Sequence, residues 1–298
     1  MRSSSLRYFA KPMRLPRSTS GSVTAEVGTI LAGVGGKGQS AKVVLLLRQI
    51  FGWLIPVLIF LGVWEFTSRL WFAHSALFPP PSQVAQALVA WHQDGELWRD
   101  VSASYWRMLV GFLSGGAVGV GLGMLTGRSR RANVALGPVI QILRPLPPVA
   151  IIPLVIVWLG IGDTAKIFST AFAVFFPVWI NTHLGAAGVA AEYLWSAQLL
   201  ERSKIRTALA VVLPATLPAV VAGFRTAIAI AFVMVYVTEI AGASAGIGYQ
   251  ISVSHLAYRI DRMMAALVVL AAAGALADLG FAGLVRLAFP WLETRTSG

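Results

Sequence analysis

Five charged side chains lie inside long apolar stretches of this sequence, where a charge is costly unless it has a function. They are Arg107, Arg144, Arg225, Glu239 and Asp278. An arginine offers a planar fork of donors that suits an oxyanion, so these positions are candidates for the path of a small anion. A structural role is the alternative, because such arginines can bond backbone carbonyls freed by prolines or pair with the buried acids.

The stretch "LRPLPPVAIIP", which begins at Leu143, is rich in proline. Each proline removes a backbone donor and clashes with the preceding turn, so this stretch is not predicted to be a straight helix. Broken helices at membrane depth are tolerated where they line a cavity or are buried in protein. A kink packed against a neighbour is the alternative. The candidates for the translocation pathway are Arg144, Pro147, Pro148, Arg225 and Glu239.

Residues for catalysis or metal binding are not arranged in any recognisable pattern. The sequence has no cysteine, its 4 histidines are scattered, and "HExxH" does not occur. The spacing "GxSxG" occurs only as "GASAG" at residues 242–246, after an apolar span and not after a strand. We therefore expect no metal and no intramembrane enzyme. A gradient-driven secondary transporter or channel remains an alternative, since acids in the membrane can relay ions.

Apolar helices must position these charges. The chain has 298 residues, of which 57% are hydrophobic and 12% charged, against roughly 25% charged in soluble domains. A helix needs about 20 apolar residues to cross a bilayer, and this predicts an all-α membrane protein with six transmembrane helices. The expected spans lie near Val43–Trp64, Tyr105–Thr126, Val134–Leu159, Ile167–Val189, Pro218–Ala241 and Met263–Ala288.

The charges between the expected spans predict an orientation. Residues 1–48 hold eight basic residues against one acid, and the turn "GRSRRAN" adds three arginines without an acid. Residues 65–104 hold two basic residues against four acids. Cytoplasmic loops are rich in Lys and Arg, so we expect both termini in the cytoplasm and a multi-pass protein of the inner (plasma) membrane. This membrane-flanking placement of the positive charge argues against nucleic acid as a partner.

The chain is expected to divide into a disordered cytoplasmic tail (1–42), a transmembrane domain (43–290) and a short C-terminal tail (291–298). The Arg- and Ser-rich tail could alternatively be an organellar transit peptide. In the outer connection we predict an amphipathic helix after Pro81, capped by Ser82, with Trp91 and Trp98 at the membrane interface. Glycines at Gly115, Gly119, Gly123 and Gly127 predict close helix packing, and "GASAGIGYQI" is expected to form an outer turn.

Several segments, in order, resemble the permease subunit of ATP-binding-cassette importers, in particular its nitrate/sulfonate/taurine/bicarbonate branch. The resemblance covers most of Trp64–Ala288 and includes "LRPLPPVAIIPLVIVWLGIGDTAKIF" and "VVLPATLPAVVAGFRTAIAIAFVMVYVTEIAGASAGIGYQI". It implies the type I ABC importer permease fold. It also implies a cytoplasmic coupling loop at residues 190–213 that docks in a groove of the ATPase. The contact residues implied are Glu192, Trp195, Ser196, Ala197, Leu199, Leu200, Glu201, Arg202, Lys204, Leu213 and Pro214.

This loop departs from the family pattern at two positions. At the family's spacing the acid position is occupied by Trp195 and the glycine position by Glu201, although Ser196 and Ala197 suit the small positions. Glu192 is an alternative acid, and an ordinary solvated loop is the alternative to docking.

The resemblance further implies the partners of the chain. They are two cytoplasmic ATP-binding-cassette ATPases, a second permease subunit (in a homodimer), an extracytoplasmic substrate-binding protein and membrane lipid. ATP is used by the ATPases, and we expect no cofactor on this chain.

Overall fold

The structure is a computed structural model that describes residues 37–71, 77–200 and 203–291. Within these ranges it consists of helices joined by turns, and it contains no strand. The chain divides into two compact units, Met1–Val63 and Trp64–Gly298. Of the first unit, the structure describes the beginning of α2 (Lys37–Trp71), so the helix starts inside the segment expected to be a tail.

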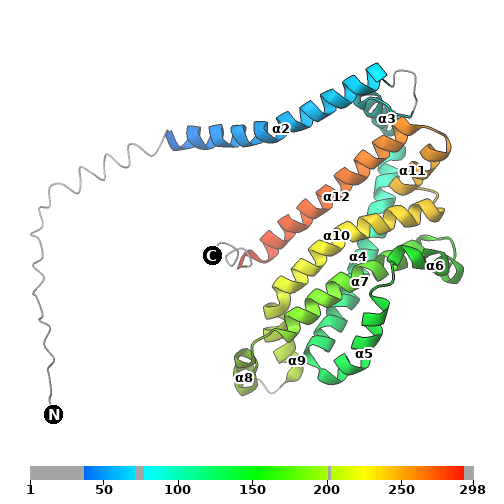
Figure 1. Cartoon of the computed structure of the whole chain (residues 1–298). Helices are drawn as coiled ribbons and strands as arrows, with labels where there is room; N and C mark the ends of the chain where they lie inside the picture. Colours follow the sequence, from blue (N-terminus) through cyan, green and yellow to red (C-terminus); the bar gives the residue numbers. More distant parts are fainter. Residues whose placement is uncertain (1–36, 72–76, 201–202, 292–298) are drawn as a thin grey trace, which may run out of the picture. The chain divides into compact units, whose positions relative to one another are not determined.

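The second unit holds the end of α2 and the remaining helices (Figure 1). They are α3 (Pro81–Gln93), α4 (Glu96–Arg128), α5 (Arg130–Leu143), the 3-10 turn η1 (Pro148–Ile151), α6 (Ile152–Leu159), α7 (Asp163–Ala187), α8 (Ala191–Leu200), α9 (Lys204–Thr207), the π-helical turn η2 (Ala208–Val212), α10 (Leu213–Gly242), α11 (Ile247–Leu256) and α12 (Ile260–Ala288).

Five helices in the described ranges are long and apolar enough to span a membrane, and α5 with η1–α6 makes a sixth span if the bent pair counts as one. The two halves of that pair meet at 87°. Three prolines lie at the bend, and Pro147 adopts an extended conformation with ψ of 121° before η1 begins at Pro148. The predicted break in this span is therefore confirmed, and the structure matches the six predicted spans in number when the bent pair is counted as one span.

Glycines bring α4 and α7 into close contact. A Cβ on Gly119 would lie 3.0 Å from the carbonyl oxygen of Phe175, and one on Gly123 would lie 2.9 Å from that of Trp179. The contacts advance in the same direction along both helices, so α4 and α7 run parallel, and the predicted role of these glycines in packing is confirmed. α10 packs on α7 in the opposite direction, with Gly223 against Pro177.

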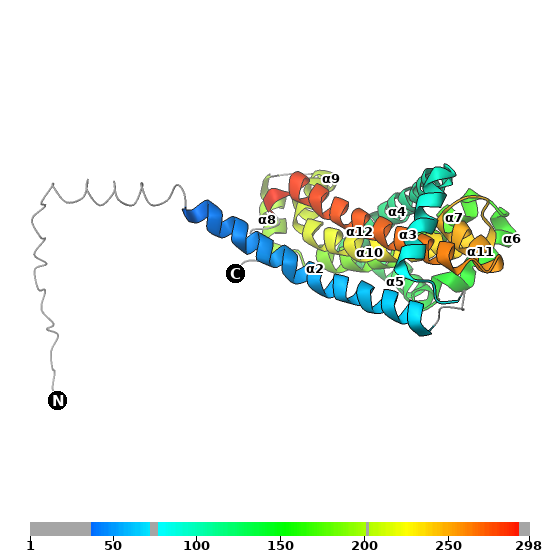
Figure 2. The ribbon, with the colours of Figure 1, turned by 90° about the horizontal axis from the view of Figure 1, so that it is seen from above.

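The bundle of α4, α7 and α10 has two ends. At one end, α4 and α7 begin, α10 ends, and α11 follows; we call it the cluster end, after the charged side chains described below. At the loop end, α8 and α9 connect α7 to α10. Figure 2 shows α10 running between these ends, with α8 and α9 at one end and α11 at the other. Apolar side chains of α4, α7, α10, α11 and α12 form the core between them.

The helix predicted after Pro81 is present as α3, but two details of the prediction were wrong. Pro80 occupies the N-cap of α3, and Ser82 instead hydrogen-bonds Glu65 of α2 through its hydroxyl at 2.8 Å. Trp91 is fully buried inside the protein and not at a membrane interface. Its indole N–H donates to the carboxylate of Asp100 at 3.2 Å, so the buried nitrogen has a partner. Trp98 is 65% exposed, and its position at the membrane interface stays a prediction.

Candidate functional site

Four charged side chains from three helices meet at one end of the bundle, and we call them the four-charge cluster: Arg107 of α4, Asp163 and Lys166 of α7, and Glu239 of α10. Arg107 Nη1 lies 2.6 Å from Glu239 Oε1, and Arg107 Nε lies 2.8 Å from Asp163 Oδ1. Lys166 Nζ lies 3.6 Å from the same Asp163 oxygen. Glu239 is fully enclosed and both cations are 7% exposed, whereas Asp163 is 54% exposed.

The enclosed carboxylate of Glu239 is held by further donors, as a buried charge must be. Ser104 Oγ lies 2.8 Å from Glu239 Oε2 and accepts a hydrogen bond from the backbone N–H of Ile247 at 2.9 Å. The N–H of Gly248 donates to Glu239 Oε2 at 2.9 Å. These bonds fix the start of α11 against α4 and α10, so Glu239 is an organising residue of the fold at this end.

Small residues are required where α11 wraps around Glu239. Gly246 has φ of 132°, a conformation that residues with a Cβ rarely adopt, and a Cβ there would overlap the Glu239 carboxylate. A Cβ on Gly248 would lie 2.6 Å from the carbonyl oxygen of Tyr236. Of the turn predicted at residues 242–251, residues 243–246 form a turn, whereas residues 247–251 belong to α11.

A second buried carboxylate extends the network. Asp100 is fully buried, accepts from the N–H of Gly246 at 3.0 Å and from Trp91, and lies 3.6 Å from Arg99. It thereby ties α3, α4 and α11 together. Sequence reasoning assigned Asp100 only to the charge count of its connection.

The pathway candidates occupy separate places in the structure. Arg144 follows α5 at the bend, and its exposed guanidinium makes no ion pair among the residues that the structure describes. Arg225 pairs with Asp278 of α12 at 3.6 Å, and both side chains are substantially exposed. Pro147 and Pro148 form the bend, and Glu239 belongs to the four-charge cluster. The structure therefore does not bring these five residues into one site.

Sequence reasoning identified Arg107 and Glu239 as unusual but missed Asp163 and Lys166. Both precede the span expected near Ile167–Val189, so neither was among the charges placed inside an apolar stretch. Their spacing of three residues was the available signal, because it places them on one face of a helix. Among residues 37–71, 77–200 and 203–291, no three His, Cys, Asp or Glu side chains gather so as to hold a metal ion.

The predicted coupling loop forms α8, α9 and η2 at the loop end. α8 presents large apolar side chains to solvent: Trp195 is 62% exposed and Leu199 88%. A hollow of about 700 Å³ is lined by Tyr193 of α8 and by Pro214 and Pro218 of α10.

The structure describes only some of the other predicted loop residues. Glu192 is exposed in the first turn of α8, and Leu213 and Pro214 begin α10. Glu201 and Arg202 lie outside the described residues, as do the side chains of Ser196, Ala197, Leu200 and Lys204.

Comparisons with known proteins agree with this architecture. A family model described as "Binding-protein-dependent transport system inner membrane component" matches residues 119–294. The putative aliphatic sulfonates transport permease protein SsuC of Escherichia coli (strain K12) is 35% identical, with 82% of this chain and 93% of SsuC covered. SsuC of Bacillus subtilis (strain 168) is 32% identical, with 82% and 90% covered.

The chain is also similar to a third permease and to a solved transporter structure. The taurine transport system permease protein TauC of Escherichia coli (strain K12) is 29% identical, with 82% of this chain and 90% of TauC covered. A solved structure of the MetNI methionine ABC transporter in an inward-facing conformation matches with a TM-score of 0.55. That match covers 64% of this chain and 95% of the MetNI chain at 18% identity, and it establishes the fold alone.

Proposed function

Because the chain belongs to the family of binding-protein-dependent transport system inner membrane components, we propose that it moves an organic sulfonate or a similar small anion across the membrane. The chain is an integral membrane permease subunit of an ABC transporter, which is a transport component rather than an enzyme. Such a permease works with ATPase subunits and with a substrate-binding protein. The substrate, the stoichiometry and the orientation are parts of the proposal.

The substrate class is supported by relatives and by chemistry. The relatives named above are designated for aliphatic sulfonates and for taurine, and the alignments cover most of each chain. The exposed guanidiniums of Arg144 and Arg225 offer paired donors to an oxyanion at membrane depth. We assign both arginines to the translocation pathway, with the bend at Pro147 and Pro148 lining it. Glu239 has a supporting role, because its carboxylate is enclosed.

The observation that carries the coupling mechanism is the exposed apolar surface of α8. Trp195 and Leu199 project from a short helix at the loop end. With 10 residues, α8 is too short to span a membrane, and exposed apolar side chains on a segment outside the spans mark a protein contact. We propose that α8 docks on a cytoplasmic ATPase, so that ATP-driven movement of the ATPases reaches α7 and α10 through the 190–213 loop.

The assembly follows from this assignment. Two copies of the chain would pair as a homodimer over two ATPases, and an extracytoplasmic binding protein would deliver the substrate to the cluster end. The basic turn at Arg128, Arg130 and Arg131 lies at the end where α4 finishes, the same end as α8. The positive-inside rule therefore supports a cytoplasmic loop end, with both termini in the cytoplasm and the chain in the inner (plasma) membrane. ATP would be bound by the ATPases and not by this chain.

Uptake by proteoliposomes tests the proposed function. The permease is reconstituted with its ATPases, and uptake of radiolabelled taurine and methanesulfonate is measured with binding protein and ATP on the appropriate sides. We expect uptake that requires both ATP and the binding protein. Uptake of a sulfonate at the full rate without the ATPases would refute an ATP-driven importer, and failure to take up either sulfonate would refute the substrate class.

A further inference from the structure

Asp163 is shared by two buried cations in the four-charge cluster. A single carboxylate oxygen, Oδ1, lies 2.8 Å from Arg107 Nε and 3.6 Å from Lys166 Nζ. The first distance is a hydrogen bond, whereas the second is longer than one. The ammonium of Lys166 is therefore attracted to Asp163 but incompletely satisfied by it.

The two acids of the cluster differ in how firmly they are held. Glu239 is enclosed and is bonded by Arg107, Ser104 and Gly248. Asp163 is more than half exposed, and it stands in the first turn of α7 after Gly162, which provides no side-chain cap. Glu239 is thus a firmly held counter-ion of Arg107, whereas Asp163, which Arg107 and Lys166 share, is the less firmly held acid.

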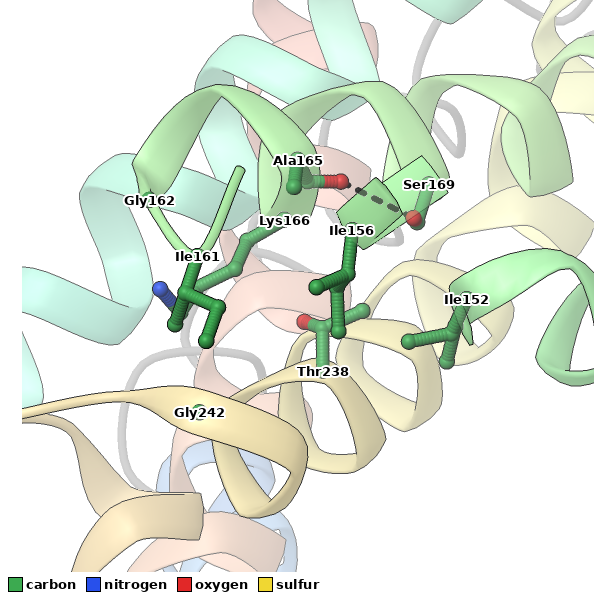
Figure 3. Close-up of a pocket in the computed structure, with 9 residues that line it drawn as sticks. All are labelled: Ile152, Ile156, Ile161, Gly162, Ala165, Lys166, Ser169, Thr238 and Gly242. Atoms are coloured by element: carbon green, nitrogen blue, oxygen red, sulfur yellow. Dashed lines mark hydrogen bonds between the residues drawn. The ribbon is translucent and has the colours of Figure 1, made fainter. Parts of the chain in front are cut away.

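A pocket adjoins the cluster on the side of Lys166 (Figure 3). Lys166 extends from α7 toward Ile161. Ile152 and Ile156 form an apolar wall, and Thr238 lies between this wall and Lys166. The free volume is about 10 Å³, which is room for about one water molecule. An anion can therefore reach Lys166 only by taking the place of a group already there.

We propose that Arg107 and Lys166 form an anion-exchange site, in which the sulfonate headgroup of the cargo replaces the Asp163 carboxylate. This assignment rests on the proposed function for the identity of the cargo. A sulfonate carries the same single charge as the carboxylate, so the exchange leaves the charge of the cluster unchanged. The three oxygens of a sulfonate can accept hydrogen bonds from Arg107 and Lys166 separately. Asp163, in contrast, presents a single oxygen, Oδ1, to both cations.

The exchange predicts that removing the competing charge improves binding. In Asp163→Asn, the two cations keep their positions but lose the resident anion, so methanesulfonate is expected to bind about tenfold tighter than in wild type. Adding Lys166→Met to that variant should remove the gain, and Lys166→Arg in its place should retain most of it. Asp261→Asn is the matched control, because Asp261 is a partly exposed acid that pairs with Arg259 outside the cluster.

The experiment uses the permease–ATPase complex in nanodiscs without binding protein, in chloride-free buffer. Methanesulfonate binding is followed by calorimetry and by the rise in melting temperature, which a bound ligand produces by mass action. Retained co-purification with the ATPases and unchanged basal ATP hydrolysis identify variants that are correctly folded. An affinity in Asp163→Asn equal to or below that of wild type, or a gain that survives Lys166→Met, would overturn the exchange site.

Failure of this inference is distinguishable from failure of the proposed function. If proteoliposomes take up sulfonates but the Asp163 and Lys166 variants bind methanesulfonate as wild type does, the importer stands and the exchange site is wrong. If no sulfonate is taken up and Asp163→Asn binds methanesulfonate no more tightly than wild type, both are wrong.

Discussion

Replacing Gly115 by alanine should force α4 away from α7. A Cβ at this position would lie 2.8 Å from both the Cα and the carbonyl carbon of Ala171, and nearer still to the carbonyl oxygen. Ordinary contact begins near 3.4 Å, so the two backbones must separate by at least about 0.6 Å, the difference between the two values. These are backbone atoms, and no side-chain rotation can relieve the overlap. Overpacking of this kind costs about 1–3 kcal/mol.

Gly121 supplies the matched control on the same helix, because a Cβ there would have nothing within 4 Å. Both substitutions gain the same helix propensity of about 1 kcal/mol, so the difference between them isolates the overlap. Unfolding free energies are measured by SDS titration in mixed micelles, with tryptophan fluorescence as the signal. Gly115→Ala should be less stable than Gly121→Ala by about 1–3 kcal/mol. Equal values within about 0.5 kcal/mol would refute the close approach of α4 and α7.

Two further predictions concern the cluster end and the loop end. Ser104→Ala should lower the unfolding free energy by about 1–3 kcal/mol, because it leaves the N–H of Ile247 and the Glu239 carboxylate short of a partner. Ser102→Ala, at an exposed position on α4, should change the unfolding free energy little. Equal effects of the two substitutions would contradict the assigned role of Ser104. Leu199→Asp should reduce ATPase co-purification without affecting membrane insertion. Leu256→Asp on α11, at a leucine that is 75% exposed against 88% for Leu199, should leave co-purification unchanged. Undiminished co-purification of Leu199→Asp would place the ATPase contact elsewhere.

The spans and the break could be predicted because their signals are local. Apolar runs of sufficient length identify spanning helices, and the prolines after Arg144 interrupt the third one wherever its neighbours lie. The glycine spacing in α4 also identified a packing face correctly, since it needs only the period of one helix. It could not identify α7 as the neighbour or show that the two helices run parallel, because that depends on how the chain folds back.

The four-charge cluster could not be derived from the sequence in the same way. Its members come from positions 107, 163, 166 and 239, and their pairing depends on the packing of three helices. The sequence grouped Glu239 with Arg144 and Arg225 as pathway candidates because each is a charge inside an apolar stretch. The structure gives it Arg107 as a partner instead, and gives Arg225 the exposed partner Asp278. Trp91 was misplaced for a related reason, since only the fold brings Asp100 to its indole.

One helix connects the two sites proposed here. α10 begins at Leu213, where the coupling loop ends, and it carries Glu239 in its last turn. Its 30 residues correspond to about 45 Å at helical rise. A movement of α8 by the ATPase would therefore reach the cluster end as a displacement of Glu239, and with it of Arg107. Because Asp163 is held by that same arginine and by Lys166, such a displacement would alter the balance between Asp163 and an incoming sulfonate. The anion-exchange site is thus placed where ATP-driven movement could change its affinity.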